Sequence, residues 1–341
     1  MSVLTPAFAG LWAEFVDPGV VAAALPTLAR HGVSVNLAWP VDAADLARRW
    51  ALVEAAERAG VAVHPWLLLQ RDAGYWAGAD NAVAFAVEAI ALTSAWVRRG
   101  HAPTTLVIDL EPAHDRVMAL EQSLRRRPPA LRAAWDALRA APSAARVRAA
   151  EATYTALVHR LHAEGWRVHL TTLPFVVDGG GRAGSALRDV LGLPVDGPDW
   201  DLVTLQAYRT LFADAACAVL GRRVGGRVYG PHLVHTYAVD ARATFGDRAG
   251  LDLGLVGDGV YPAQIYTGPA DLAADLGAAR AAGLSPAHLC VYNLDGVLGR
   301  GAAEDWLAVT PTDGAPRPDR ATGLTRRAIG AAGRLVARRR G

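Results

Sequence analysis

The sequence contains no lysine, so all 35 residues counted as Lys or Arg are arginines. With 33 acidic residues, the formal net charge is +2. Schiff-base aldolases, pyridoxal-phosphate enzymes and P-loop nucleotide hydrolases each depend on a lysine amine, which a guanidinium group cannot replace as a nucleophile. The absence of lysine therefore excludes these three classes of enzyme.

Cysteine is almost as scarce, and long apolar runs are missing. Cys217 and Cys290 cannot form a disulfide framework, and no C-x-x-C pair indicates zinc or redox chemistry, so we expect both to be small buried hydrophobic residues. The first fifteen residues lack the basic start and the apolar run of a secretory signal. The longest apolar stretch, 81–97, contains Glu88 and is too short to span a bilayer comfortably, which predicts a buried helix. We expect a cytoplasmic protein without a membrane span.

Apolar runs of strand length alternate with helical stretches rich in Ala, Leu and Arg. Eight such runs occur, at 8–16, 33–40, 61–69, 104–112, 166–177, 200–212, 250–259 and 288–298. Strands that alternate with helices form a parallel sheet, and eight such units predict an α/β protein with a (β/α)8 TIM barrel over residues 1–310. An open doubly wound sheet is the alternative, but no strand is followed by a G-x-G-x-x-G turn.

Two segments depart from the regular spacing of the barrel, namely the connection between the fourth and fifth strands and residues 221–250 between the sixth and seventh. About fifty residues separate the fourth and fifth strands, and the segment 125–150 within them predicts an added helical hairpin. Residues 311–341 form a linker and a basic amphipathic tail, which we expect to be a solvated terminus.

Polar and aromatic residues gather where the predicted strands end, and the carboxyl ends of the strands form the active-site face of a TIM barrel. Aromatic rings stack on sugar faces while acids and amides hold hydroxyl groups, so this set predicts a carbohydrate substrate. The candidate substrate-binding residues are Trp12, Glu14, Trp39, Trp66, Gln206, Arg209, Tyr292, Asn293 and Asp295.

Two acids end the fourth strand in the stretch TTLVIDLEP. Side chains alternate along a strand, so Asp109 and Glu111 point the same way, with Cα atoms about 6.5 Å apart. Each carboxylate raises the cost of ionising the other, which favours one protonated carboxyl group near neutral pH. The pair is therefore a candidate for acid catalysis.

Four short motifs together resemble the family 18 glycoside hydrolases, the chitinases and endo-β-N-acetylglucosaminidases. They are VIDLEP at the fourth strand, LTTLPF (170–175) at the fifth, LQAYRT (205–210) at the sixth and VYNLDGVL (291–298) at the eighth. The resemblance implies that Glu111 is the general acid, that Asp109 orients the N-acetyl group of the substrate, and that Tyr208 hydrogen-bonds that group. It implies no cofactor.

The sequence also departs from the pattern of that family. Thr104 and Val107 stand where two aspartates are usual, Arg209 follows Tyr208, and Tyr292 replaces a tryptophan. A changed substrate or a lost activity remains open.

Two other functions are compatible with the same residues. A metal-dependent TIM-barrel hydrolase would use His64, Asp109, Glu111 and His114 as ligands, although no H-E-x-x-H motif is present. A non-catalytic carbohydrate-binding barrel would hold a sugar in the same cleft without cleaving it. We expect a monomer that does not bind nucleic acid.

Overall fold

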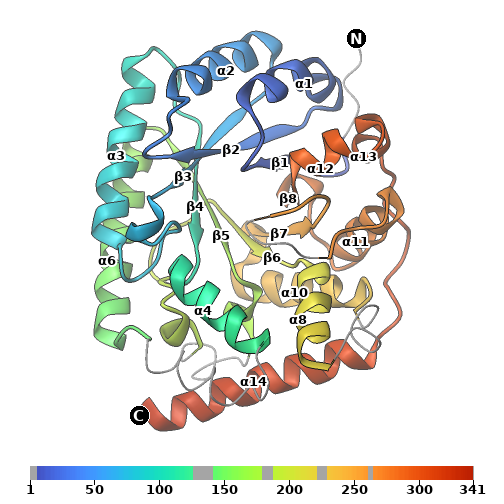
Figure 1. The fold of residues 1–341 in the computed structure, drawn as a ribbon. Coiled ribbons are helices and arrows are strands. Elements are labelled where there is room, and N and C mark those ends of the chain that lie inside the picture. The colour runs from blue at the N-terminus through green and yellow to red at the C-terminus, as the bar shows by residue number, and fades with distance from the viewer. Residues whose placement is uncertain (1–5, 126–140, 179–186, 221–228, 260–263, 341) are drawn as a thin grey trace. The chain divides into compact units, whose positions relative to one another are not determined.

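The fold is a closed parallel barrel of eight strands in the order β1 to β8, each strand hydrogen-bonded to its neighbours in sequence (Figure 1). The computed structural model describes residues 6–125, 141–178, 187–220, 229–259 and 264–340. The strands are β1 Gly10–Ala13, β2 Ser34–Pro40, β3 Val63–Leu68, β4 Thr105–Leu110, β5 Arg167–Thr172, β6 Leu202–Gln206, β7 Ala249–Gly254 and β8 Leu289–Tyr292. The predicted (β/α)8 barrel is therefore confirmed.

Helices follow the strands along the chain. They are α1 Pro18–His31, α2 Leu46–Ala59, α3 Ala82–Arg98, α4 His114–Arg125, α6 Ala144–Ala163, α8 Arg209–Leu220, α10 His232–Phe245, α11 Pro269–Ala281, α12 Leu294–Gly299, α13 Ala303–Leu307 and α14 Arg320–Arg340. Helix α4 is additional to α6 between β4 and β5, whereas much of the predicted hairpin over 125–150 lies outside the described residues. No helix in the described part of the chain has the length and apolar character that crossing a bilayer requires.

The chain divides into two compact units. The first consists of Met1–Trp66, Leu202–Asp214 and Tyr229–Pro318, and the second of Leu67–Asp201, Ala215–Val228 and Asp319–Gly341. The tail from residue 319 belongs to the second unit, and the predicted boundary at residue 310 stays a prediction.

Contacts that skip a strand show which side chains of the first unit point into the barrel. The indole Nε1 of Trp12 in β1 donates to Asp252 Oδ1 in β7 over 3.0 Å, although β8 lies between these strands. The Trp12 and Trp66 rings meet edge to face at 4.9 Å, with β2 between β1 and β3. Side chains two strands apart meet only on the concave side of a closed sheet, so Trp12, Trp66 and Asp252 fill the barrel interior.

The second unit shows the same alternation in β4 and β5. These strands pair in parallel with Asp109 opposite Thr171 and Ile108 opposite Leu170. One face of the pair is the apolar set Leu106, Ile108, Leu110, Val168 and Leu170, all fully buried. An apolar face of this kind is the one that helices cover in a barrel, which places Asp109 on the opposite, inner face.

Helix α3 is only partly buried, which corrects the expectation from its apolar sequence. Phe85, Ala89 and Trp96 are buried, and the Phe85 ring packs 6.0 Å from Tyr154 of α6. Val83 on the outer face is 70% exposed. Apolar composition therefore predicted the helix, but not that its outer face meets solvent.

Two glycines bring the loop after β7 against helix α12 in the first unit. A Cβ atom on Gly296 would lie 2.4 Å from the backbone nitrogen of Gly257, and one on Gly257 would lie 2.8 Å from that of Gly296. Asn293 Nδ2 donates to the carbonyl of Asp258 over 2.6 Å at the same place. These backbones approach so closely that no side chain fits between them.

Candidate functional site

The candidate site of the first unit is built around Glu14 and Tyr292. Glu14 directly follows β1, and Tyr292 ends β8, where it pairs in register with Trp12. The phenol of Tyr292 donates a hydrogen bond to Glu14 Oε2, and the Tyr208 ring lies 5.7 Å from the Tyr292 ring. All three side chains are buried. A phenol that donates to a buried carboxylate at the carboxyl end of a barrel is an arrangement suited to proton transfer.

A second carboxylate lies deeper in the barrel, and it was not among the predicted site residues. Asp252 is fully buried and accepts hydrogen bonds from Trp12 Nε1 and, over 2.6 Å, from Thr204 Oγ1. Gln206, at the end of β6, pairs in register with Asp252 and therefore shares its inner face. Period-two alternation in the run 250–254 was the signal that could have identified Asp252.

The charge of Asp252 also affects Cys290 in β8. Burial, together with the nearby Asp252 carboxylate, raises the pKa of the Cys290 thiol well above its ordinary value. The thiol accepts a 3.7 Å contact from Asn36 Nδ2 and is buried, as predicted for a small hydrophobic residue. Cys290 therefore stays protonated and has no nucleophilic character.

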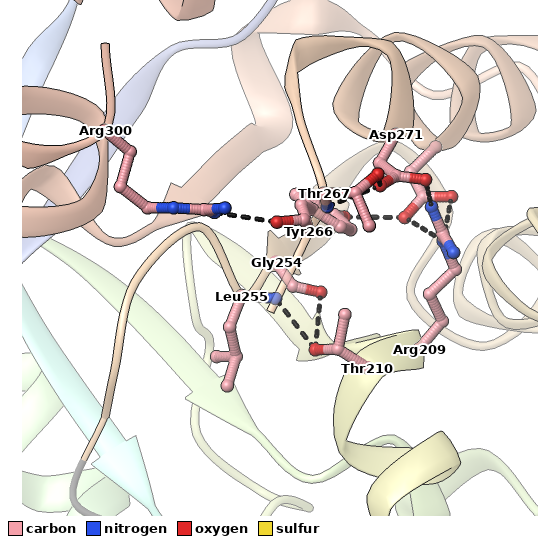
Figure 2. Close-up of polar contacts among 9 residues, drawn as sticks. Arg209, Thr210, Gly254, Leu255, Tyr266, Thr267, Asp271 and Arg300 are labelled. Carbon is pink, nitrogen blue, oxygen red and sulfur yellow. Dashed lines mark hydrogen bonds and ion pairs between the residues drawn. The ribbon is translucent and has the colours of Figure 1, made fainter. Parts of the chain in front are cut away.

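Arg209 belongs to a buried ion-pair network (Figure 2). Its Nε lies 2.8 Å from both carboxylate oxygens of Asp275, and its Nη2 lies 2.8 Å from Asp271 Oδ1. Tyr266 completes the network, because its phenol donates to Asp275 Oδ2 over 2.6 Å and its ring lies 5.2 Å from the Arg209 guanidinium. The network joins the start of α8 to α11 and to the segment before α11.

Burial and the ion pairs of this network act against each other on the pKa values of its members. Burial raises the pKa of Asp275 to about 6, although the Arg209 charge and the Tyr266 hydrogen bond oppose that shift. Burial also acts to lower the pKa of Arg209, but the Asp275 charge and the hydrogen bonds to Asp271 and Asp275 outweigh it, and the pKa of Arg209 is raised. The guanidinium group is therefore charged whether or not Asp275 holds a proton.

Other contacts hold the adjoining loops of the first unit in place (Figure 2). The Thr210 hydroxyl accepts from the Leu255 amide over 2.9 Å and donates to the Gly254 carbonyl over 3.2 Å. Arg300 donates to the carbonyl of Tyr266 over 2.7 Å. These bonds fix the backbone on both sides of the loop that follows β7.

The remaining predicted residues of the first unit have varied surroundings. Asn293 is fully buried and caps α12, because its Oδ1 accepts from the Gly296 amide over 3.1 Å. Asp295 lies in the first turn of that helix, where burial raises its pKa. Trp39 is buried and packs edge to face on Trp50 at 4.7 Å, and Trp66 Nε1 has no hydrogen-bond partner among the described residues.

In the second unit, Asp109 and Glu111 are both buried at the end of β4. The Ala77 amide donates to the Asp109 carbonyl over 2.9 Å, and the Glu111 amide donates to the Ala77 carbonyl over 3.0 Å. A pocket of about 10 Å³, room for one water molecule, is lined by residues that include Trp76, Glu111 and Arg116. This pocket is too small to hold a sugar, and the roles of Asp109 and Glu111 remain predictions.

The second unit also contains an ion pair between the end of β5 and the last helix. Arg326 of α14 donates to Asp178 Oδ1 from Nε over 2.7 Å and approaches it from Nη2 over 2.6 Å. Asp178 follows the short 3-10 helix Pro174–Val177 and is only 2% exposed. An arginine that is paired with a buried carboxylate is important for docking the helix that carries it.

We expect Arg326→Gln to loosen α14, because glutamine removes the positive charge that Arg326 places against the buried Asp178 carboxylate. Hydrogen exchange of the backbone amides from Thr322 to Arg334 should accelerate by about tenfold or more, measured by mass spectrometry. Arg327→Gln is the matched control, since Arg327 is the adjacent residue and is exposed. Equal protection in both variants would contradict the assigned role.

The described residues contain no group of three or more His, Cys, Asp or Glu side chains that could hold a metal ion. His114 lies at the start of α4, 5.7 Å from the Trp76 ring and 3.4 Å from Asp115 Oδ1. His64 lies within β3. The described geometry therefore gives the predicted metal-ligand set His64, Asp109, Glu111 and His114 no further support.

The fold defines the class of the protein as a (β/α)8 barrel. Comparison with known proteins supports this fold and assigns no family. No family model and no curated protein matches the chain. Among solved structures it is similar to a D-allulose 3-epimerase from Methylomonas sp. (TM-score 0.42, 13% identity, covering 99% of this chain and 100% of that one). It is also similar to an L-ribulose 3-epimerase, with a TM-score of 0.42 and 13% identity, covering 98% of this chain and 96% of that one. A third similar structure is a xylose isomerase-like TIM barrel protein from Mycobacterium smegmatis in complex with magnesium. Its TM-score is 0.39 at 12% identity, covering 99% of this chain and 100% of that one.

These findings correct the resemblance to family 18 glycoside hydrolases. No family model supports it, and the barrels to which the chain is similar are named as sugar epimerases and an isomerase-like protein. The physical reason is that the four motifs are strand ends, where polar residues follow an apolar run in any TIM barrel. The resemblance and the glycosidase function inferred from it were wrong.

Proposed function

We propose that this chain is an enzyme that moves a proton on a carbohydrate or a related polyhydroxylated molecule. The observation that carries the proposal is the hydrogen bond from Tyr292 to the buried Glu14 carboxylate, with the Tyr208 ring beside it. Each of these residues lies at or directly after the carboxyl end of a strand, where TIM-barrel enzymes carry their catalytic groups.

In this proposal Glu14 accepts a proton from the substrate, and Tyr292 stabilises the carboxylate before the transfer. A carboxylate can remove a proton from a carbon next to a carbonyl group, as sugar isomerisation requires, provided that the proton lies within hydrogen-bond reach. Gln206 and the aromatic rings of Tyr208 and Tyr292 supply the amide and apolar faces that a sugar uses for orientation. Asp252 lies deeper and holds Trp12 in place.

Deuterium exchange tests the proposal on many candidate sugars at once. The protein is incubated in D₂O with a panel of aldoses and ketoses, and carbon-bound deuterium is followed by NMR. We expect the wild type to exchange one C–H position of at least one sugar at a rate well above that without protein. Binding of a sugar without any exchange would instead indicate the non-catalytic carbohydrate-binding barrel.

A further inference from the structure

Helix α14 presents two different faces along its length. Thr322, Gly330 and Gly333 are buried on one face, together with the Arg326 side chain that pairs with Asp178. Asp319 caps the start of the helix by accepting from the Thr322 amide over 2.6 Å and from the Thr322 hydroxyl over 2.8 Å. This face attaches the helix to the second unit.

The opposite face is exposed and carries an apolar stripe. Leu324, Ala328 and Ala331 follow the spacing i, i+4, i+7 and are all exposed, Leu324 to 65%. Arg327 and Arg334 are exposed as well and lie along one edge of the stripe at helical spacing. An apolar stripe flanked by arginines is the pattern of a helix that lies in the plane of a membrane surface.

All charged side chains of the last segment are positive. Residues 320–341 contain seven arginines and no acidic residue, whereas the whole chain has a net charge of only +2, so the remainder of the protein is net negative. A positively charged segment on a negatively charged protein favours an anionic partner at this one face. The segment has no aromatic residue, no Asn and no Gln, which leaves arginine as its main group for stacking on or reading nucleic acid bases.

We propose that the outer face of α14 binds membrane surfaces that contain anionic lipid headgroups. Leu324 inserts at the boundary between headgroups and acyl chains, and Arg327 and Arg334 pair with lipid phosphates and carboxylates. Arg326 and the small residues of the inner face keep the helix attached to the second unit during binding. The protein thereby docks on the membrane through its last helix, independently of the chemistry at Glu14.

Vesicle sedimentation of the full chain tests the proposal. We expect the wild type to sediment with vesicles of phosphatidylcholine and phosphatidylserine, to remain in solution with phosphatidylcholine alone, and to detach as the salt concentration is raised. Arg327→Glu/Arg334→Glu should reduce binding by about tenfold or more, since each arginine near an anionic surface contributes about fivefold. Leu324→Ser should reduce it as well.

Arg58→Glu/Arg98→Glu is the matched control, because it makes the same change in net charge at two exposed arginines outside α14 and should bind as the wild type does. Where circular dichroism shows that the glutamate variant has lost helix, Arg327→Gln/Arg334→Gln replaces it. Equal binding to both kinds of vesicle, no binding to either, or tighter binding to a short RNA than to the anionic vesicles would each overturn the proposal.

Discussion

Arg209→Met is expected to lower the free energy of unfolding by about 3–5 kcal/mol, the usual cost of removing one partner from a buried ion pair. Asp275 is fully buried and would lose the guanidinium that contacts both of its oxygens. Methionine fills much of the space of the arginine side chain but cannot pair with the carboxylate. Denaturant unfolding measures the difference.

The control for this prediction is Arg280→Met, which changes an exposed arginine on α11, the helix that carries Asp275. This variant should lower the free energy of unfolding by less than about 0.5 kcal/mol. The double variant Arg209→Met/Asp275→Asn should recover much of the lost stability, because asparagine carries no charge and can still accept from Tyr266. An Arg209→Met variant as stable as Arg280→Met would show that the network does not contribute to stability.

The pH dependence of unfolding provides an independent measure of the same network. The folded-state pKa of Asp275 is raised from 3.8 to about 6, mainly because the carboxyl group is buried. Between these values the folded protein holds a proton that the unfolded chain has lost, so the contribution of Asp275 to stability falls as the pH rises from about 4 to about 6. Arg209→Met removes the attraction that opposes burial and therefore raises the pKa of Asp275 further. The difference in the free energy of unfolding between wild type and this variant should therefore grow above pH 6.

Glu14→Gln is expected to reduce deuterium exchange into the substrate by about 10²–10⁴-fold, because the amide keeps the shape of the carboxylate but cannot accept the proton. Tyr292→Phe removes the phenol that donates to Glu14 and should lower the rate less, with the larger change in kcat than in KM. Initial rates of exchange at several sugar concentrations measure both effects.

Glu304→Gln is the matched control, since Glu304 makes its contacts with Arg30 and His31 and is half exposed. It should leave the exchange rate unchanged. A Glu14→Gln variant that exchanges as fast as Glu304→Gln would remove Glu14 from the reaction and leave the membrane-docking proposal untouched.

The barrel was predictable because its strands are compact apolar runs separated by helical sequence. The run TTLVIDL, for example, corresponds to β4 Thr105–Leu110. Strand ends were less predictable. The sequence predicts one strand over 288–298, but β8 ends at Tyr292, and Asn293 then caps a helix. Leu294, Val297 and Leu298 continue the apolar character beyond that boundary, so an apolar run alone does not mark where the strand ends.

The site was predictable to the extent that it follows from strand ends. Glu14 and Tyr292 are candidates because they lie where predicted strands end, and their roles stay predictions. The contact between them depends on the register of β1 and β8. Nothing in the sequence pairs Arg209 with Asp275, which lies 66 residues further along the chain. The one local sign is that Asp275 interrupts the buried face formed by Leu272 and Leu276 in α11.

The close approach of Gly257 and Gly296 has a consequence for motion in the first unit. Because backbone meets backbone there, the loop after β7 and helix α12 have no layer of side chains that could slide or change rotamer. A ligand that shifts one of these segments must shift the other by a similar amount, so adaptation to substrates of different size has to come from other loops of the barrel.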